Sequence, residues 1–336
     1  MIIIKQQLEE TTTQPVKQWV TVVNVLIVAN VFVWMIGLFL WLSTSDVPPI
    51  RRDDFVMAVD VAAPIVQETQ DFELDEALKL GEVDFSIESQ SALLINLDTG
   101  EFLFNYNGDV RMYPASVTKI MTVLIGIEYA TSDDIVVMAN FPALSEAGAS
   151  MAGFVNHEMR TLSEILHGSL LSSGADATSS IAYHVAGSYP NFVALMNETA
   201  RRLGMTNTHF MNASGLHHEN HFTTAYDTAL LLQYALSNPD FREIFTTPRY
   251  EFVDFFGTPQ TMYSTFYRLA PTLNVRGGEI LGGKTGFTTP AGLSLASIAT
   301  DGFYEFALIT FGAPANGMIP HITDAFAIYD YFFNLD

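Results

Sequence analysis

Ser116 and Lys119 have the types and the spacing of a nucleophile and its base. Pro114 suits the first turn of a helix, and mostly apolar residues follow it, so residues 114–127 predict a buried helix. Lys119 would lie one turn after Ser116 on the same face, and burial lowers the pKa of a lysine. The neutral amine can then accept the proton of Ser116, whose developing negative charge the helix N-terminus favours. The alternative is a capping serine beside a lysine that reaches solvent.

Lys284 and Thr285 form a second group of polar side chains, bounded by Gly283 and Gly286. Glycines on both sides let another stretch of backbone come close. A lysine and a hydroxyl at a strand edge can bind a carboxylate, and the free N–H groups of the strand can bind an extended peptide. Lys284, Thr285 and Gly286 are therefore candidate substrate-binding residues, unless the segment is an ordinary surface turn.

Ser173 lies between two predicted helices and is followed by Gly174 and Ala175. A serine hydroxyl at such a place can relay a proton to a leaving group. Ser173 therefore joins Ser116 and Lys119 as a candidate catalytic residue. The alternative is a plain loop that connects two helices.

Three histidines, His217, His218 and His221, lie close together near Asn212 and Glu219. Histidines four residues apart can share a zinc ion, but the spacing does not match the His-Glu-x-x-His pattern. We therefore expect a polar loop here, and we expect neither a metal nor a cofactor.

The composition limits the class of protein. The chain has 336 residues, of which 49% are hydrophobic, so it can bury a sizeable core. Its formal net charge of −22 argues against nucleic acid or an anionic lipid surface as a partner. The absence of cysteine excludes disulfides and cysteine nucleophiles.

The N-terminal part differs in character from the rest. Residues 19–42 are almost wholly apolar, long enough to span a hydrocarbon core of ~30 Å, and longer than a typical signal peptide's apolar region. We expect a tail at 1–17, an uncleaved transmembrane anchor at 18–43, an acidic linker at 44–84 and a globular domain at 85–336. A cleaved signal peptide is the alternative.

The globular part predicts strands at both ends and helices between them. Expected strands cover residues 92–97, 101–105, 293–300 and 303–311, and expected helices cover residues 162–171, 178–186, 192–203, 224–237 and 322–333. This order favours an α+β fold in which one antiparallel sheet, built from both ends of the domain, packs with a helical middle.

Several segments resemble a known family. Penicillin-binding proteins and class A β-lactamases typically have three motifs in this order: Ser-x-x-Lys, a second serine motif and Lys-Thr-Gly. The longer resemblance is to the serine D-alanyl-D-alanine carboxypeptidases, the low-molecular-weight penicillin-binding proteins of peptidase family S11. The matching segments are YPASVTKIMT at residues 113–122, NASGL at 212–216, TTAYD at 223–227 and KTGFT at 284–288.

The resemblance implies a β-lactamase/DD-peptidase-like fold and removal of the terminal D-alanine from peptidoglycan stem peptides through an acyl-enzyme. It implies Ser116 as the nucleophile, Lys119 as its base and Ser173 as the serine of the second motif. Lys284 and Thr285 would anchor the substrate carboxylate, and the N–H groups of Ser116 and Phe287 would form the oxyanion hole. β-Lactam antibiotics would act as covalent inhibitors.

The resemblance also implies a location and leaves alternatives. Because peptidoglycan lies outside the plasma membrane, we expect a single-pass protein with the N-terminus inside and the catalytic domain outside. The second motif of the family usually ends in Asn, where this chain has Ala175. A β-lactamase, or a catalytically weak protein of the same fold that binds peptidoglycan, remains the alternative.

Overall fold

The computed structural model describes residues 74, 77–138, 148–254 and 256–334. They belong to the second of two compact units, Gln70–Asp336. The expected tail and anchor and most of the expected linker lie outside the described residues. Within the described part of the chain, no helix is long and apolar enough to cross a membrane.

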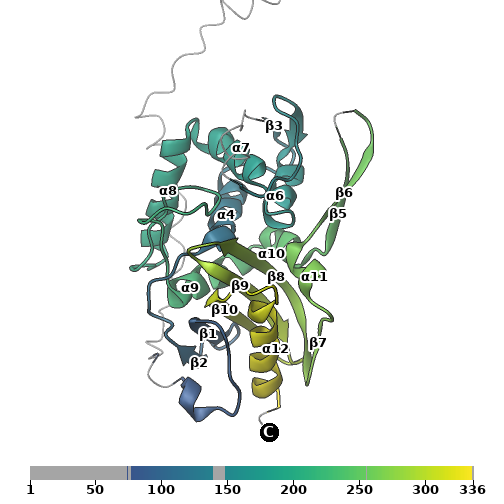
Figure 1. Ribbon diagram of the computed structural model, residues 1–336. Helices are drawn as coiled ribbons and strands as arrows, with labels where there is room; N and C mark the ends of the chain where they lie inside the picture. Colours follow the sequence, from purple (N-terminus) through teal and green to yellow (C-terminus); the bar gives the residue numbers. More distant parts are fainter. Residues whose placement is uncertain (1–73, 75–76, 139–147, 255, 335–336) are drawn as a thin grey trace, which may run out of the picture. The chain divides into compact units, whose positions relative to one another are not determined.

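A six-stranded antiparallel sheet forms the lower half of the unit in Figure 1. Its order, β2-β1-β10-β9-β8-β7, places the first strands of the domain beside the last, which confirms the expected sheet from both ends. The strands are β1 (Ser91–Asn96), β2 (Phe102–Tyr106), β7 (Asn274–Val275), β8 (Gly278–Thr288), β9 (Gly292–Thr300) and β10 (Glu305–Ala313).

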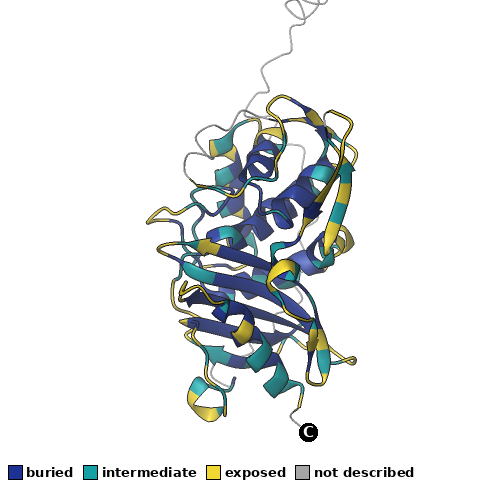
Figure 2. Ribbon diagram, turned by 45° about the vertical axis from the view of Figure 1, so that its right-hand side comes forward, coloured by how far each residue is buried: buried dark blue, intermediate teal, exposed yellow. Residues whose placement is uncertain are grey.

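Helices cover both faces of this sheet. Along β1 and β10 the side chains alternate: Leu93, Ile95 and Ile309 join the large helical core, whereas Leu94 and Leu308 pack with α12 on the opposite face. Each such fully buried leucine or isoleucine contributes about 1.5–3 kcal/mol. The central strands are buried on both sides, as Figure 2 shows in dark blue, so their sequences are mostly apolar without strict alternation.

The helical middle lies above the sheet in Figure 1, and α12 lies on the outer face of the sheet. Two short two-stranded sheets, β3 with β4 and β5 with β6, flank it. Their bounds are Ile135–Val137, Met159–Thr161, Arg249–Val253 and Pro259–Tyr263. The helices are α4 (Lys119–Tyr129), α6 (Leu162–Leu170), α7 (Ala175–Ala186), α8 (Tyr189–Arg202), α9 (Ala225–Leu236), α10 (Pro239–Thr246), α11 (Thr265–Leu269) and α12 (Pro320–Phe332).

Two details differ from the expectation. The helix expected from residue 114 begins as a 3-10 turn, η2 (Ala115–Thr118), and becomes α-helical only at Lys119. Residues expected at the end of the linker contact the sheet: Leu78 bridges to Phe104, and η1 (Leu80–Glu82) follows. The packed chain therefore includes residues before 85.

Candidate active site

The turn η2 presents Ser116 half-buried, and α4 begins at a fully buried lysine. The Lys119 Nζ lies 3.0 Å from the Ser116 Oγ and donates at 2.5 Å to the carbonyl of Ser214. Burial lowers the pKa of Lys119 from 10.5 to about 7, and the negative charge of Asp176 acts in the opposite direction. The pair therefore combines hydrogen-bond distance with an amine that is partly neutral near pH 7.

Lys284 enters the same site from β8. Its Nζ donates to the Ser173 Oγ at 3.1 Å and to the carbonyl of Thr285 at 2.8 Å. Burial, and next the charge of Lys119, lower the pKa of Lys284 well below its ordinary value. At Gly286 the same strand approaches the Ser116 backbone nitrogen, so the fold brings the strand of Lys284 to the turn before Lys119, although the two lysines are 165 positions apart in the sequence.

Ser173 has a backbone conformation that few non-glycine residues adopt. Its φ is +58°, in the left-handed region, and its side chain is only 4% exposed. Gly174 donates to the carbonyl of Gly168 at 3.0 Å, which helps to hold the turn. Such local strain persists where surrounding contacts fix it, and it is often found at functional sites.

The part of β8 that carries the Lys-Thr-Gly motif runs along the turn with Ser116. A Cβ added at Gly286 would lie 3.0 Å from the Ser116 backbone nitrogen, a tighter contact than side chains normally make, so glycine suits this approach. β7 pairs with β8 only at Gly278 and Glu279, so no strand among the described residues covers the edge of β8 near Thr285. This edge can accept an extended peptide.

Two hydroxyl groups and an aromatic ring lie at the C-terminal part of β8 or beside it. The Thr285 Oγ1 donates to the Thr265 Oγ1 at 2.8 Å, and Phe287 is 52% exposed. Thr265 opens α11, and nothing in the sequence indicated its part in the site. The candidate residues come from η2, from α4, from the turn before α7 and from β8: they are Ser116, Lys119, Ser173, Lys284, Thr285, Gly286 and Phe287. Hydrogen bonds join Ser116 to Lys119 and Ser173 to Lys284, and Gly286 lies against the Ser116 nitrogen.

Asp176 fixes the loop beside the second serine motif. Its carboxylate accepts hydrogen bonds at 2.8–3.2 Å from four backbone N–H groups, those of Ala152, Gly153, Phe154 and Ala177. The preceding residue, Ala175, is fully buried, and its N–H donates to the carbonyl of Ser150 at 2.8 Å. The position where the family usually has an amide thus carries only a buried methyl group.

The histidines do not share a site. His217 packs edge-on against Tyr113 with ring centroids 4.7 Å apart, whereas His221 is buried and lies 2.9 Å from the Thr118 Oγ1. The described residues contain no group of three potential metal ligands. The loop is therefore exposed only in part, because the His221 side chain is buried against η2, the reactive turn that carries Ser116.

The sequence pattern of a peptidase family described as D-alanyl-D-alanine carboxypeptidase, family S11, matches residues 78–315. The chain belongs to this family.

Two curated relatives are about 30% identical to the chain over the aligned residues. The D-alanyl-D-alanine carboxypeptidase DacF of Bacillus subtilis is 33% identical over 256 residues, which cover 72% of this chain and 63% of DacF. DacC of Escherichia coli is 31% identical over 240 residues, covering 68% of this chain and 57% of DacC. The chain therefore spans less than two thirds of the length of these two relatives.

Solved structures agree with the fold. A D-alanyl-D-alanine carboxypeptidase from Mycobacterium tuberculosis has a TM-score of 0.67 and 26% identity, covering 75% of this chain and 93% of that structure. A point mutant of the Streptomyces K15 DD-transpeptidase has a TM-score of 0.68 and 25% identity, covering 75% of this chain and all of that structure. The chain has the DD-peptidase fold.

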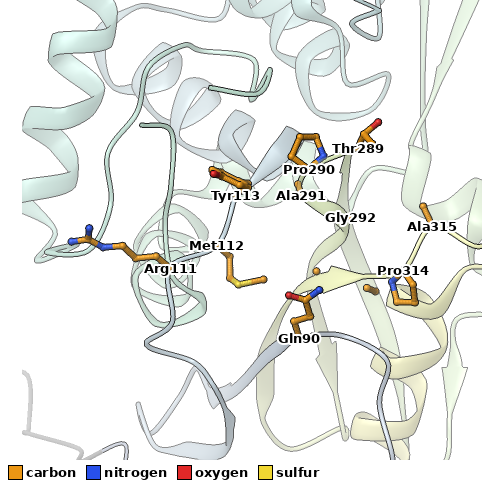
Figure 3. Close-up of a pocket in the computed structure, with 12 residues that line it drawn as sticks. Gln90, Arg111, Met112, Tyr113, Thr289, Pro290, Ala291, Gly292, Pro314 and Ala315 are labelled. Atoms are coloured by element: carbon orange, nitrogen blue, oxygen red, sulfur yellow. The ribbon is translucent and has the colours of Figure 1, made fainter. Parts of the chain in front are cut away.

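A cleft of about 390 Å³ opens beside Tyr113, three residues before Ser116 in the sequence (Figure 3). It is bounded by residues 111–113, which lead to Ser116, and by 289–292, which follow Phe287. In Figure 3 the guanidinium of Arg111 points away from the other lining side chains. The cleft therefore offers mainly small, apolar and uncharged polar groups.

Proposed function

We propose that the protein is a serine DD-carboxypeptidase that removes the terminal D-alanine from peptidoglycan stem peptides. The observation that carries this proposal is the distance of 3.0 Å between the Ser116 Oγ and a buried lysine, Lys119, with the pKa lowered to about 7. A serine beside a neutral amine is an activated nucleophile. Membership of family S11 supports the substrate, because its members are described as D-alanyl-D-alanine carboxypeptidases.

In the proposed reaction, Ser116 attacks the carbonyl carbon of the penultimate D-alanine and gives its proton to Lys119. The backbone N–H groups of Ser116 and Phe287 stabilise the oxyanion, a role supported by the close approach of β8 to the Ser116 nitrogen. The C–N bond then breaks, and the leaving amine takes a proton by way of Ser173 and the lysines. Water hydrolyses the acyl-enzyme and restores the serine.

The carboxylate at the end of the substrate would bind to Lys284 and Thr285. Both side chains face the site from β8, and the free edge of β8 suits an extended peptide. We further propose that the cleft beside Tyr113 receives the part of the stem peptide that precedes the two D-alanines. β-Lactams would acylate Ser116 in the same way and form a stable adduct.

The assay is release of D-alanine from a tripeptide that ends in D-Ala-D-Ala, together with labelling by a fluorescent penicillin. The full chain should do both, Ser116→Ala should do neither, and Lys119→Ala should acylate orders of magnitude more slowly because the serine loses its base. Labelling that persists in Ser116→Ala would show that Ser116 is not the nucleophile. Rapid penicillin hydrolysis without D-alanine release would favour a β-lactamase, and stable labelling without turnover would favour a weak binding protein.

We also propose that the catalytic domain acts outside the plasma membrane and is tethered by residues 18–43. The support is the apolar run at 19–42 together with a substrate class that lies outside the membrane. The sequence between this run and the described domain is acidic, as is typical of a linker.

A further inference from the structure

His221 is buried directly behind the reactive turn. Its side chain is 2% exposed, and its Nε2 lies 2.9 Å from the Oγ1 of Thr118, the residue that precedes Lys119. Its ring also packs edge-on against Phe210 at 5.6 Å. The histidine is therefore tied to the segment that carries the nucleophile and its base, although it comes from a loop about 100 residues later.

The hydrogen bonds of His221 define which nitrogen carries the proton. The backbone N–H of Met211 donates to Nδ1 at 3.4 Å, so Nδ1 is an acceptor and the neutral ring carries its hydrogen on Nε2. That hydrogen then points to the Thr118 Oγ1. Burial lowers the pKa of His221 to about 3, helped by the charges of neighbouring histidines and of Lys119, which keeps the ring neutral.

Thr118 has no other visible role for its hydroxyl at the start of α4. It occupies the N-cap position, where a threonine side chain normally accepts from an N–H of the first turn, but it makes no such bond. Its hydroxyl is 2.9 Å from His221 instead. A potential capping group has thus been used to connect the turn to the loop behind it.

Three further contacts join the loop 211–221 to the same segment. They are the Thr122 Oγ1 donating to the Ala213 carbonyl at 2.7 Å, the Lys119 Nζ donating to the Ser214 carbonyl at 2.5 Å, and the close approach of Gly215 to the Ala115 carbonyl, 1.8 Å from a Cβ added at Gly215. The loop therefore holds η2 and the start of α4 at several points, and Thr118, the residue that His221 contacts, lies between the nucleophile and its base in the sequence.

We infer that His221 is a positioning residue, which through Thr118 holds the turn so that Ser116 and Lys119 keep the spacing that acylation requires. The inference rests on the proposed function, because it assigns the turn to acylation. A displacement of about 1 Å of a reacting group can cost a hundredfold in rate. Loss of this support should therefore lower the acylation step and leave noncovalent binding of the penicillin unchanged.

The experiment compares full-length variants by stopped-flow acylation, which separates the first-order acylation constant from the dissociation constant of the initial complex. His221→Leu removes both ring contacts, and we expect the acylation constant to fall by about tenfold to a hundredfold. His221→Gln keeps a donor near the Nε2 position and should remain within about threefold of wild type, whereas His221→Asn keeps only the acceptor for Met211 and should resemble His221→Leu. His218→Gln, on the exposed part of the same loop, is the matched control and should change nothing.

The partner residue gives an independent check. Thr118→Val should reproduce the effect of His221→Leu, and the double variant should be no slower than either one, because both remove the same contact. Thermal unfolding identifies variants that fail to fold. A folded His221→Leu protein with the wild-type acylation constant, or a His221→Asn protein as fast as His221→Gln, would overturn the inference.

A second measurement does not depend on activity. The chain has five lysines, so ¹³C-labelled lysine gives a simple NMR spectrum in which Lys119 can be assigned by Lys119→Arg. If His221 holds the turn, His221→Leu should admit water around Lys119 and raise its titration midpoint by at least about one pH unit, while His221→Gln should leave it unchanged. An unchanged midpoint in His221→Leu contradicts the inference. Failure of the wild type to acylate contradicts the proposed function instead.

Discussion

The pH dependence of acylation offers the sharpest test of the lysine as base. Lys119 is fully buried, and burial lowers its pKa from 10.5 to about 7. With the ordinary pKa, about one lysine in 3,000 would be neutral at pH 7, whereas a pKa of about 7 leaves about half neutral. Burial therefore increases the reactive population by about a thousandfold, which corresponds to a shift of about 5 kcal/mol.

The sign of the pH effect follows from this role. Only the neutral amine accepts the proton of Ser116, so the acylation constant should rise about tenfold per pH unit below pH 7 and become constant above about pH 8. At pH 5 it should be about 1% of the plateau. The measurement is the second-order acylation constant with a fluorescent penicillin from pH 5 to pH 9, at constant ionic strength.

A second buried lysine makes a control necessary, because two coupled groups share their titration. Lys284→Gln removes that lysine; it should slow acylation, but the midpoint should stay near pH 7 if it belongs to Lys119. A profile that is flat from pH 5 to pH 9, or a midpoint near pH 10, would refute the reasoning that burial activates Lys119.

Two further predictions concern position 175 and the N-terminal apolar run, where this chain departs from the usual pattern of the family. Ala175→Asn should raise acylation by about tenfold to a hundredfold, since an amide hydrogen bond that involves a charged group contributes about 1.5–3 kcal/mol. A well-folded variant that is slower with both penicillin and the D-Ala-D-Ala peptide would show that the pocket has adapted to alanine. Protease added to intact cells should remove residues after 43 and spare the N-terminal tail; a mature protein that begins after residue 42 would instead identify a signal peptide.

Local patterns predicted much of the fold and of the reactive centre. The spacing of Ser116 and Lys119, three residues apart on a helical turn, was enough to predict that their side chains meet. In the structure the Lys119 Nζ lies 3.0 Å from the Ser116 Oγ. The strands at 92–97 and 303–311 could be recognised because each is mostly apolar and adjoins a turn signal, Asp98-Thr99-Gly100 or Asp301-Gly302, and they pair as β1 and β10. Where the chemistry lies within one turn or one strand, the sequence is sufficient.

Contacts made by the backbone across long separations could not be predicted in this way. The acceptor for Lys119 is the carbonyl of Ser214, a group that every residue has, so no residue type marks it. His221 was visible only as one of three histidines in a polar loop, because its burial depends on the packing of that loop against α4. Its partner, Thr118, likewise gave no signal beyond its place before the lysine.

Position 175 involves both a sequence pattern and long-range backbone contacts. The ammonium of Lys119 is held by the Ser116 hydroxyl and by the Ser214 carbonyl, neither of which depends on the side chain at 175. The backbone of Ala175 is fixed through its N–H, which donates to the Ser150 carbonyl, a bond that most residues could make. Replacement of the usual amide by a methyl group therefore leaves the nucleophile and its base in place. It follows that Ala175→Asn should alter the rate and the binding of the substrate, but the midpoint of the pH profile should remain near that of Lys119 in the native chain.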